Sequence, residues 1–423
     1  MAMFTPEKLA EIRKLAESGD ANAQYALAAS LSQSGSRDES RKWLEKSAAQ
    51  DHGDALYTLA TLQFGSFDAM PGAIELLERA AARGSPLATR QLAAILIAGA
   101  GVESDAERAN QFLLGAARSD DHAAMTEIAA ALTLQNPDDP DVSPLLREAA
   151  SRDGTAAAVF VSRAALARPN TDTHTAKTFL SKLSAARYPH AAFLEDGLRE
   201  AHHQTVSDAT LEWDAISTRL LGESAINTKA EALSERPHIK IYRKVVPPEL
   251  CEYVIAHTAR LLAPAKIVDP VTGQSRPDSI RHSYTATIGL VDVDTIIARI
   301  NRCVAEIVGR PADHGEFLSI LHYQPGQEYK RHYDWLPDGD DVARNGQRAA
   351  TALLCLNDDY EGGETHFVTP DLNVRGSTGD LIVFENVTSD GAIDRETQHA
   401  GLPVKNGAKW MASRWFRERI YRF

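Results

Sequence analysis

The spacing of apolar positions divides the chain into two halves with different periods. In the first half, apolar residues return every three or four positions, as on one face of a helix, and pairs of such segments repeat along the chain. From His238 onward, short alternating or apolar runs are separated by Gly, Pro and Asp, which is typical of β-strands joined by turns. The pattern therefore predicts a multi-domain protein with two fold classes.

The first half carries an internal repeat of two helices per unit. A small residue recurs at steps of 32, 33, 36, 34 and 34 positions, at Ala23, Ala55, Ala88, Ala124, Ala158 and Ala192. A second series follows bulky apolar residues, at Ala49, Ala82, Ala117, Ala150 and Ala186. Small residues let helices approach closely, and leucines and aromatics fill the grooves between them. We expect an N-terminal all-α solenoid of helix-turn-helix repeats over residues 6–200.

The repeat motif resembles a known family. The segment G-D-A-N-A-Q-Y-A-L, from Gly19 to Leu27, with its paired alanine before the next unit, is similar to Sel-one-like repeats, which are related to tetratricopeptide repeats. Leu27 is replaced by Ser162 in the fifth unit and by Asp196 in the sixth, so we expect less regular stacking there. The resemblance implies a scaffold that holds a peptide or a partner protein on its concave surface. Residues 201–236, with a helix over 210–221, are interpreted as a helical linker.

The second half predicts strands with flanking helices. Strand signals lie at residues 239–246, 317–323, 350–356 and 381–384, and helical spacing is retained at 247–262 and 293–308. Turn residues such as Pro325-Gly326 and Glu361-Gly362-Gly363 separate them. This order of elements favours a β-sandwich with helices packed on one side.

Composition and charge narrow the partners. The 423 residues have 45 Lys and Arg against 58 Asp and Glu, a formal net charge of -13 that disfavours nucleic acid. The cysteines Cys251, Cys303 and Cys355 are far apart and without a C-x-x-C pair, which argues for a reducing compartment. The charged start of the chain gives no signal-peptide core, and no long apolar segment follows. We expect a cytoplasmic protein with no nucleic-acid and no membrane partner.

A candidate metal site is found in the second half. In His332-Tyr333-Asp334 the alternation of an extended chain turns the histidine and the carboxylate to one face, and His399 offers a third ligand 67 positions later. Two histidines and one carboxylate leave open positions on Fe(II) for a co-substrate and dioxygen. His52-Gly53-Asp54 also fits H-x-D, but it lies within the helical repeats and is interpreted as a solvated helix entry.

Lys409 is a candidate for holding the co-substrate. It lies ten residues beyond His399, and its ammonium could make a charge-assisted bond to the far carboxylate of a 2-oxo-dicarboxylate. The spacing alone also permits an ordinary surface lysine, so this assignment depends on its neighbours.

The motifs of the second half resemble the prolyl 4-hydroxylase group of Fe(II)/2-oxoglutarate oxygenases over residues 237–423. Five of them occur in order: Tyr323 to Asp334, Gly362 to Thr365, Gly379-Asp380 with Phe384, His399 to Val404, and Gly407 to Trp410. The resemblance implies a double-stranded β-helix, or jelly-roll, with flanking helices. It also implies Fe(II), 2-oxoglutarate and O2 as reactants, with ascorbate as a candidate reductant.

The same resemblance assigns residues to roles. His332, Asp334 and His399 would bind iron, Lys409 would pair with the distal carboxylate of 2-oxoglutarate, and Tyr323 would hydrogen-bond the co-substrate. Thr351 and Trp415 match pocket-lining positions. Cys355 stands where many relatives have a tyrosine, so one hydrogen bond to 2-oxoglutarate is expected to be missing. Residues 269–281 are interpreted as a lid over the substrate, with a plain surface loop as the alternative.

The resulting hypothesis is a dioxygenase that hydroxylates a side chain, with proline as the expected residue, in a peptide or protein recruited by the repeats. Three alternatives stay open from the sequence. The enzyme could act on a free amino acid or another small molecule, the chain could be a catalytically inactive binding scaffold, or the metal could be a hydrolytic zinc. The sequence does not indicate the substrate, the stereochemistry or the oligomeric state.

Overall fold

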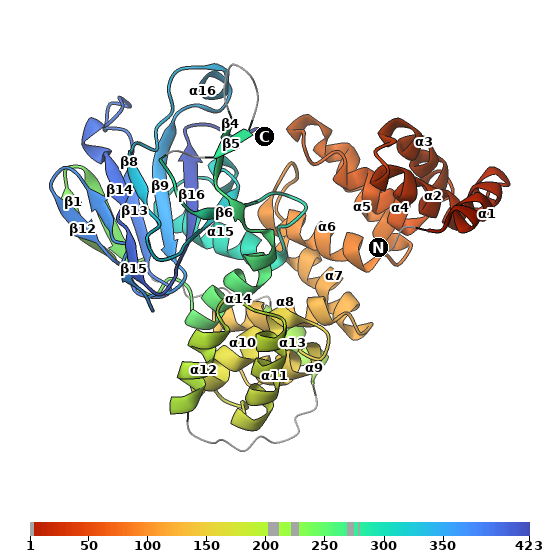
Figure 1. Cartoon of the computed structure of the whole chain (residues 1–423), viewed down its shortest axis with the longest axis horizontal. Coiled ribbons are helices and arrows are strands. Elements are labelled where there is room, and N and C mark those ends of the chain that lie inside the picture. The colour runs from red at the N-terminus through yellow and green to blue at the C-terminus, as the bar shows by residue number, and fades with distance from the viewer. Residues whose placement is uncertain (1–3, 202–210, 221–227, 269–274, 278–279) are drawn as a thin grey trace. The chain divides into compact units, whose positions relative to one another are not determined.

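A computed structural model describes residues 4–201, 211–220, 228–268, 275–277 and 280–423 (Figure 1). The chain forms two compact units. The first comprises Met1–Asp121, Val293–Thr295 and Phe423, and the second comprises His122–Asp292 and Ile296–Arg422. Each unit is treated by itself below. The domain boundaries expected at residues 200 and 237 stay a prediction, because two parts of the interpreted linker, 202–210 and 221–227, lie outside the described residues.

The first unit contains helix pairs. Its helices are α1 (Pro6–Glu17), α2 (Ala21–Gln33), α3 (Arg37–Ala48), α4 (Gly53–Thr61), α5 (Met70–Ala82), α6 (Pro86–Ala98) and α7 (Ala106–Arg118), with a short 3-10 turn η1 (Phe67–Ala69). A polar side chain precedes most helices and accepts a hydrogen bond from the first turn, as Asp20 does from the Ala23 amide at 2.7 Å. His52 caps α4 in the same way, accepting from the Ala55 amide at 3.3 Å, which agrees with the helix-entry interpretation.

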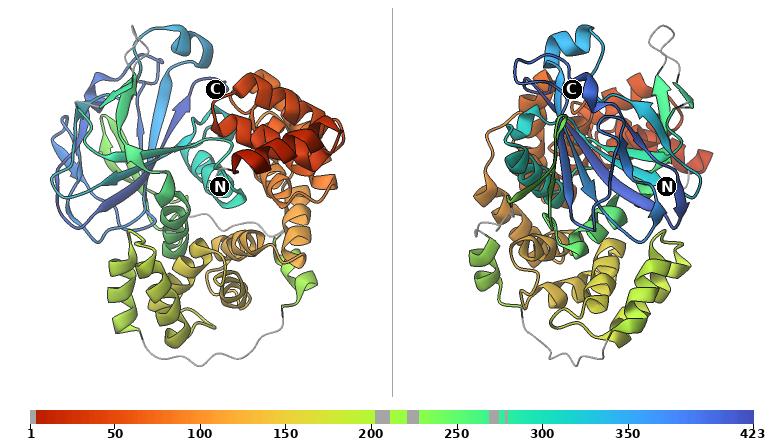
Figure 2. Two further views of the ribbon diagram at one scale, coloured as in Figure 1. Left: turned by 45° about the vertical axis from the view of Figure 1, so that its right-hand side comes forward. Right: turned by 90° about the vertical axis from the view of Figure 1, so that its left-hand side faces the viewer.

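The repeats continue in the second unit. Its repeat helices are α8 (His122–Gln135), α9 (Val142–Ala149), α10 (Gly154–Ala165), α11 (Thr173–Ala185) and α12 (Ala191–Glu200), and α13 (Trp213–Leu220) lies in the interpreted linker. Figure 2 shows these helices stacked beside one another. Together the two units confirm the expected helical repeats.

The first alanine series packs as expected except at its end. Five of its six members are buried, whereas Ala192 is exposed. The second series is only partly buried: Ala117 and Ala150 are covered, but the other three, Ala49, Ala82 and Ala186, which lie at the last position or the C-cap of their helices, are exposed. The interpretation of the second series as close helix contacts was therefore wrong at those three positions.

The strands form an antiparallel sandwich. The larger sheet has the order β1 (Ala230–Glu235), β2 (His238–Tyr242), β13 (Leu381–Glu385), β9 (Arg348–Cys355), β16 (Lys409–Arg417), β7 (Leu318–Tyr323), β6 (Tyr284–Ile288) and β3 (Ala263–Pro264). The smaller sheet has the order β12 (Leu372–Val374), β11 (Thr365–Phe367), β14 (His399–Gly401) and β8 (Tyr329–His332). Two further pairs are β10 (Glu361–Gly362) with β15 (Val404–Asn406) and β4 (Lys266–Val268) with β5 (Ser275–Pro277). This arrangement confirms the predicted jelly-roll.

Two helices cover one face of the larger sheet, α14 (Pro248–Thr258) and α15 (Thr295–Val308). The Cys251 thiol of α14 contacts the carbonyl of Cys355 in β9 at 3.8 Å, and Arg414 of β16 donates to the carbonyl of Asn301 in α15 at 2.6 Å. Short turns η2 (Ala259–Leu261), η3 (Ala312–His314) and η4 (Arg395–Thr397) and helix α16 (Asp340–Asn345) complete the unit. The helix α14 also packs on α8 and α10 of the repeats.

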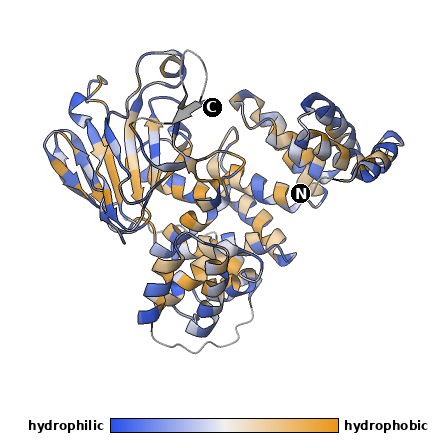
Figure 3. Cartoon of the chain, in the orientation of Figure 1, coloured by the Kyte–Doolittle hydropathy of each residue, from blue (hydrophilic) through white to orange (hydrophobic). Residues whose placement is uncertain are grey.

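The opposite face of the larger sheet encloses the core with the smaller sheet. Ile239, Leu353, Phe367, Phe384 and Met411 meet there and are buried. Figure 3 shows the apolar residues along the central strands of this sheet. Among the described helices, none is both long and apolar enough to cross a membrane.

Candidate metal and co-substrate site

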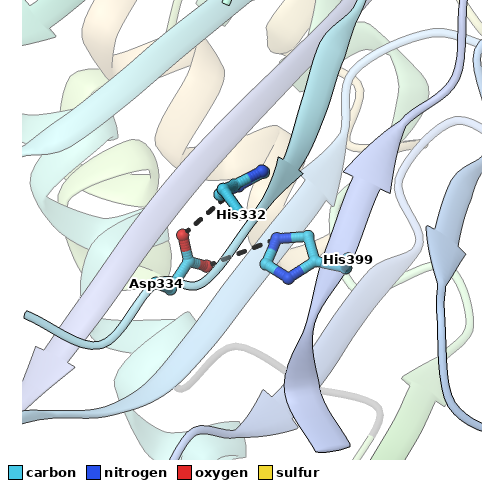
Figure 4. A group of neighbouring side chains, drawn as sticks. All are labelled: His332, Asp334 and His399. Atoms are coloured by element: carbon cyan, nitrogen blue, oxygen red, sulfur yellow. Dashed lines mark ion pairs between the residues drawn. The ribbon is translucent and has the colours of Figure 1, made fainter. Parts of the chain in front are cut away.

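Three side chains from the smaller sheet converge on one point. His332 of β8 lies directly opposite His399 of β14, and their ring centroids are 4.3 Å apart. Asp334 follows two residues after β8 ends, and its oxygens lie 3.7 Å from the Nε2 atom of each histidine (Figure 4). The candidate ligand atoms all lie within 4.8 Å of one another. The cross-strand register therefore joins residues that are far apart in the sequence.

Backbone carbonyls orient both rings. The Nδ1 atom of His332 lies 2.8 Å from the Lys330 carbonyl, and that of His399 lies 2.9 Å from the Thr397 carbonyl. A carbonyl oxygen only accepts, so each Nδ1 carries the proton and each Nε2 directs its lone pair towards the others. This tautomer leaves both Nε2 atoms free to bind a metal ion.

The charge state of the three groups also suits a divalent metal. Burial, together with the neighbouring His399, lowers the pKa of His332 to about 4. Burial by itself would raise the pKa of Asp334, but the two histidines and Arg348 outweigh it and the pKa is lowered. A neutral imidazole and an ionised carboxylate are available at neutral pH, and a set of two histidines and one carboxylate is the facial arrangement of non-haem Fe(II) oxygenases.

A buried hydroxyl supports the carboxylate. The Oγ1 atom of Thr351 in β9 donates to Oδ2 of Asp334 at 2.7 Å, and Asn386 donates to the same Oγ1 at 2.9 Å. The sequence placed Thr351 at a pocket-lining position, and the structure places it behind Asp334, fully buried. Its contact with the co-substrate stays a prediction. Asn386 was missed, because a single asparagine after a strand carries no motif.

A pocket opens between the two sheets beside these ligands. Its lining includes Tyr323, Tyr329, Leu353, Lys409 and Trp415, together with the three candidate ligands. The predicted residues Tyr323, Lys409 and Trp415 thus lie with the triad in one pocket. Cys355 is buried in the core beneath it, where burial raises the pKa of its thiol to about 11. A thiol in this state behaves as a small apolar group.

Lys409 is held at the end of the pocket. It pairs directly with Tyr323 across the strands β16 and β7, and its Nζ atom donates to the Gly363 carbonyl at 2.6 Å. Burial lowers the pKa of Lys409 to about 8. A buried ammonium with one neutral partner favours an anion, so this end of the pocket suits a carboxylate.

The Gly362-Gly363 turn makes the lysine contact possible. Both residues have positive φ, 72° and 68°, which glycine adopts without strain. A Cβ atom on Gly363 would lie 3.3 Å from Cδ of Lys409 and 3.2 Å from the ring of Tyr360. The sequence marked this turn as part of a motif, and the close approach to Lys409 gives its physical reason.

One aromatic residue and one basic residue border the triad. The ring of Tyr329 stacks on His332 with centroids 3.5 Å apart, and the Arg281 guanidinium lies 5.3 Å from the Tyr329 ring centroid. Arg281 had been assigned only to the end of the interpreted lid. Residues 269–274 and 278–279 of that segment lie outside the described residues, so the lid stays a prediction.

Comparison with known proteins agrees with this geometry. The sequence model of the 2OG-Fe(II) oxygenase superfamily matches residues 318–417. Probable prolyl 4-hydroxylase 3 of Arabidopsis thaliana is 33% identical over 211 residues, which are 45% of this chain and 73% of that protein. Prolyl 4-hydroxylase 1 of the same plant is 33% identical over 207 residues, which are 46% of this chain and 73% of that protein.

Solved structures resemble each part of the chain. A Sel1 repeat protein from Oxalobacter formigenes is 25% identical, with a TM-score of 0.38, and covers 43% of this chain and 79% of its own. A viral collagen prolyl hydroxylase from Paramecium bursaria Chlorella virus-1 is 27% identical, with a TM-score of 0.34, and covers 42% of this chain and 94% of its own. From the two plant relatives, and from a site with two histidines, a carboxylate and a buried lysine, it follows that the chain belongs to the prolyl 4-hydroxylase family of 2-oxoglutarate and Fe(II)-dependent oxygenases.

Proposed function

We propose that this protein is a 2-oxoglutarate-dependent dioxygenase that hydroxylates proline in a peptide or protein. The observation that carries the proposal is the shared pocket of His332, Asp334, His399 and Lys409. A metal triad alone would also suit other reactions. The buried lysine on the same pocket adds the partner for a dicarboxylate co-substrate, and so favours an oxygenase over a hydrolytic zinc site.

In this proposal each residue has one task. His332, Asp334 and His399 would hold Fe(II), which would couple the oxidative decarboxylation of 2-oxoglutarate by dioxygen, to succinate and carbon dioxide, with hydroxylation of the substrate by the second oxygen atom. Lys409 binds the distal carboxylate, and Tyr323 hydrogen-bonds the co-substrate. Trp415 forms part of the pocket wall. The apolar walls keep water away from the reacting centre, so that oxidation is directed at the substrate.

The substrate class follows from the relatives. The curated relatives are prolyl 4-hydroxylases, and we extend proline as the target residue to this chain. We further propose that the repeats recruit the protein that contains the proline, since arrays of stacked helix pairs offer extended binding surfaces. The three cysteines are buried and free, which supports a reducing, cytoplasmic location, and ascorbate is a candidate reductant for the iron.

The test uses the full chain loaded anaerobically with Fe(II). On exposure to oxygen, 2-oxoglutarate should be converted to succinate, and the rate should rise when a proline-containing protein from the native interactome is added. Mass spectrometry should locate one added oxygen atom on a proline of that protein. Turnover stimulated by a free amino acid and not by proteins would instead support the small-molecule alternative. No succinate with fully loaded iron would support the inactive scaffold.

A further inference from the structure

The loop between the repeat helices α11 and α12 reaches into the oxygenase part of the same unit. The Tyr188 hydroxyl donates to Oε1 of Glu252 in α14 at 2.5 Å, and Nδ1 of His190 lies 2.7 Å from Oε2 of the same carboxylate. His190 and Glu252 are 5% and 3% exposed, so these bonds are shielded from solvent. Two residues of the repeats thus bind both oxygens of one buried glutamate.

The second nitrogen of His190 points to another carboxylate. Its Nε2 atom lies 3.5 Å from Oδ1 of Asp359, in the loop between β9 and β10. Burial alone would lower the pKa of His190, but Glu252 and Asp359 outweigh it and raise the pKa to about 9. The ring is therefore protonated at neutral pH, with a hydrogen bond from Nδ1 to Glu252 and an ion pair, not a hydrogen bond, between Nε2 and Asp359. One repeat residue bridges helix α14 and the β9–β10 loop.

From Asp359 the contacts continue to both neighbours of Lys409. Asn357 donates to Oδ1 of Asp359 at 2.6 Å and to the carbonyl of Ala408 at 2.6 Å. Its own Oδ1 accepts from the amide of Trp410 at 2.7 Å. Asn357 therefore fixes the backbone immediately before and immediately after the lysine.

The same loop also supplies the lysine's partner. Asp359 lies four residues before Gly363, whose carbonyl accepts from Nζ of Lys409. A Cβ atom at Gly407 would lie 2.5 Å from the carbonyl oxygen of Asp359, so the loop and the start of β16 are in close contact. Movement of Asp359 would thus be transmitted to both the backbone and the ammonium of Lys409.

We propose that His190, a residue of the repeats, is a positioning residue for the 2-oxoglutarate end of the pocket. It acts through Asp359 and Asn357 on the placement of Lys409, and so sets the affinity for the co-substrate. The inference rests on the proposed function of Lys409, and it gives the last repeats a task besides recruitment. It also makes the oxygenase depend on a segment outside its own strands.

A second contact between the same parts provides a control. Arg168 donates to Oε1 of Glu249 at 2.6 Å, and Arg163 lies 3.6 Å from the same oxygen. Glu249 is fully buried at the start of α14. No described hydrogen bond leads from this cluster to the β9–β10 loop. Loss of Arg168 therefore weakens the attachment of α14 to the repeats without releasing Asp359.

The experiment compares four variants of the full chain. His190→Leu removes the bridge, and Asp359→Asn weakens it from the oxygenase side while keeping an acceptor for Asn357. His174→Leu changes an exposed histidine of α11, and Arg168→Met removes the second contact. Two quantities are measured: the amide hydrogen exchange of residues 357–363 in the metal-free protein, and the dissociation constant of 2-oxoglutarate in the anaerobic Fe(II) protein, from its charge-transfer absorbance.

We expect His190→Leu and Asp359→Asn to accelerate exchange over residues 357–363 and to weaken 2-oxoglutarate by about 3- to 30-fold, the usual range for such coupling. His174→Leu and Arg168→Met should stay within about two-fold of the original affinity. The Asp359 side chain is 29% exposed, so Asp359→Asn should fold. If His190→Leu does not fold, the result for Asp359→Asn alone tests the inference.

Two results would overturn the inference. One is unchanged exchange and affinity in folded His190→Leu or Asp359→Asn. The other is an equal loss in Arg168→Met, since the repeats would then only stabilise the fold. If the original protein binds iron but no 2-oxoglutarate, the proposed function fails first, and the exchange measurement still decides whether His190 holds the loop.

Discussion

Thr351 donates a hydrogen bond of 2.7 Å to the Oδ2 atom of Asp334, from a neighbouring sheet and in a fully buried position. Because Asn386 donates to the same hydroxyl, the hydroxyl proton must point to Asp334. One lone pair of the carboxylate is thereby engaged, and the carboxylate is fixed in orientation before a metal binds.

Replacement of Thr351 by valine should therefore weaken iron binding. The shape is retained while the bond to Asp334 is lost, and removal of such a supporting bond usually reduces metal affinity about 10- to 100-fold. Anaerobic Fe(II) titration measures the effect. Thr258→Val is the matched control, since Thr258 is equally buried but bonds only the Val254 carbonyl of its own helix. Equal iron affinity in both variants would show that the bond does not orient the ligand.

The two histidines of the triad should be individually essential. With only two ligands left, the facial geometry is lost, so His332→Ala and His399→Ala should each abolish 2-oxoglutarate turnover. The melting curve by circular dichroism should keep a cooperative transition in both. Wild-type turnover with normal iron content in either variant would mean that another residue is the ligand.

Lys409→Ala should separate co-substrate binding from iron binding. A hydrogen bond to a charged group contributes about 1.5–3 kcal/mol, so the KM for 2-oxoglutarate should rise about ten- to a hundred-fold or more. Iron affinity, measured on the same preparation, should change far less. An unchanged KM would remove Lys409 from the co-substrate site.

The affinity for 2-oxoglutarate should also depend on pH through Lys409. Its pKa is about 8, so the ammonium that attracts the dicarboxylate is present below that pH and is lost above it. The KM for 2-oxoglutarate should rise as pH increases from 8 to 9.5, by up to about ten-fold per pH unit. Lys409→Arg keeps its charge in this range and should show a flat profile. A similar rise in both proteins would assign the pH dependence to another group.

Stability should depend on pH through His190. Its folded-state pKa of about 9 lies above the ordinary value of 6.5, so its contribution is complete below about pH 6.5 and is lost as pH rises through 9. The carboxylates of Glu252 and Asp359 face it, and the Tyr188 hydroxyl shares Glu252 with it. His322, whose pKa burial lowers to about 4, also interacts with it electrostatically. The free energy of unfolding should therefore fall between pH 6.5 and 9 in the original protein, and less in His190→Leu. Parallel curves would show that His190 is not the titrating group.

Local sequence patterns predicted much of the fold and of the site. The helical period and the strand runs reflect interactions between residues that are close in sequence. The motif around His332 reflects the ligands that a metal ion requires. His399 was found because a third ligand was required, although its pairing with His332 depends on strand register. Lys409 was found from its spacing after His399, and the family motif then supported it.

Other residues could not be found in this way. Asn386 and His190 are single residues whose roles depend on contacts made by distant parts of the chain. The exposed members of the second alanine series, such as Ala49 and Ala82, show a related difficulty. A recurring small residue marks a position in the repeat, but the packing around each individual helix decides whether that position is covered.

The burial of Glu249 against Arg163 and Arg168 limits how the chain could be recombined. A chimera that joins a foreign repeat array directly to the strands would leave this carboxylate without its cationic partners, and loss of a buried partner typically costs about 3–5 kcal/mol. A viable fusion would have to retain α8 to α12 as part of the oxygenase, since α8 and α10 both pack on α14, and exchange only the repeats before them. The last repeats and the oxygenase would therefore have to be exchanged together.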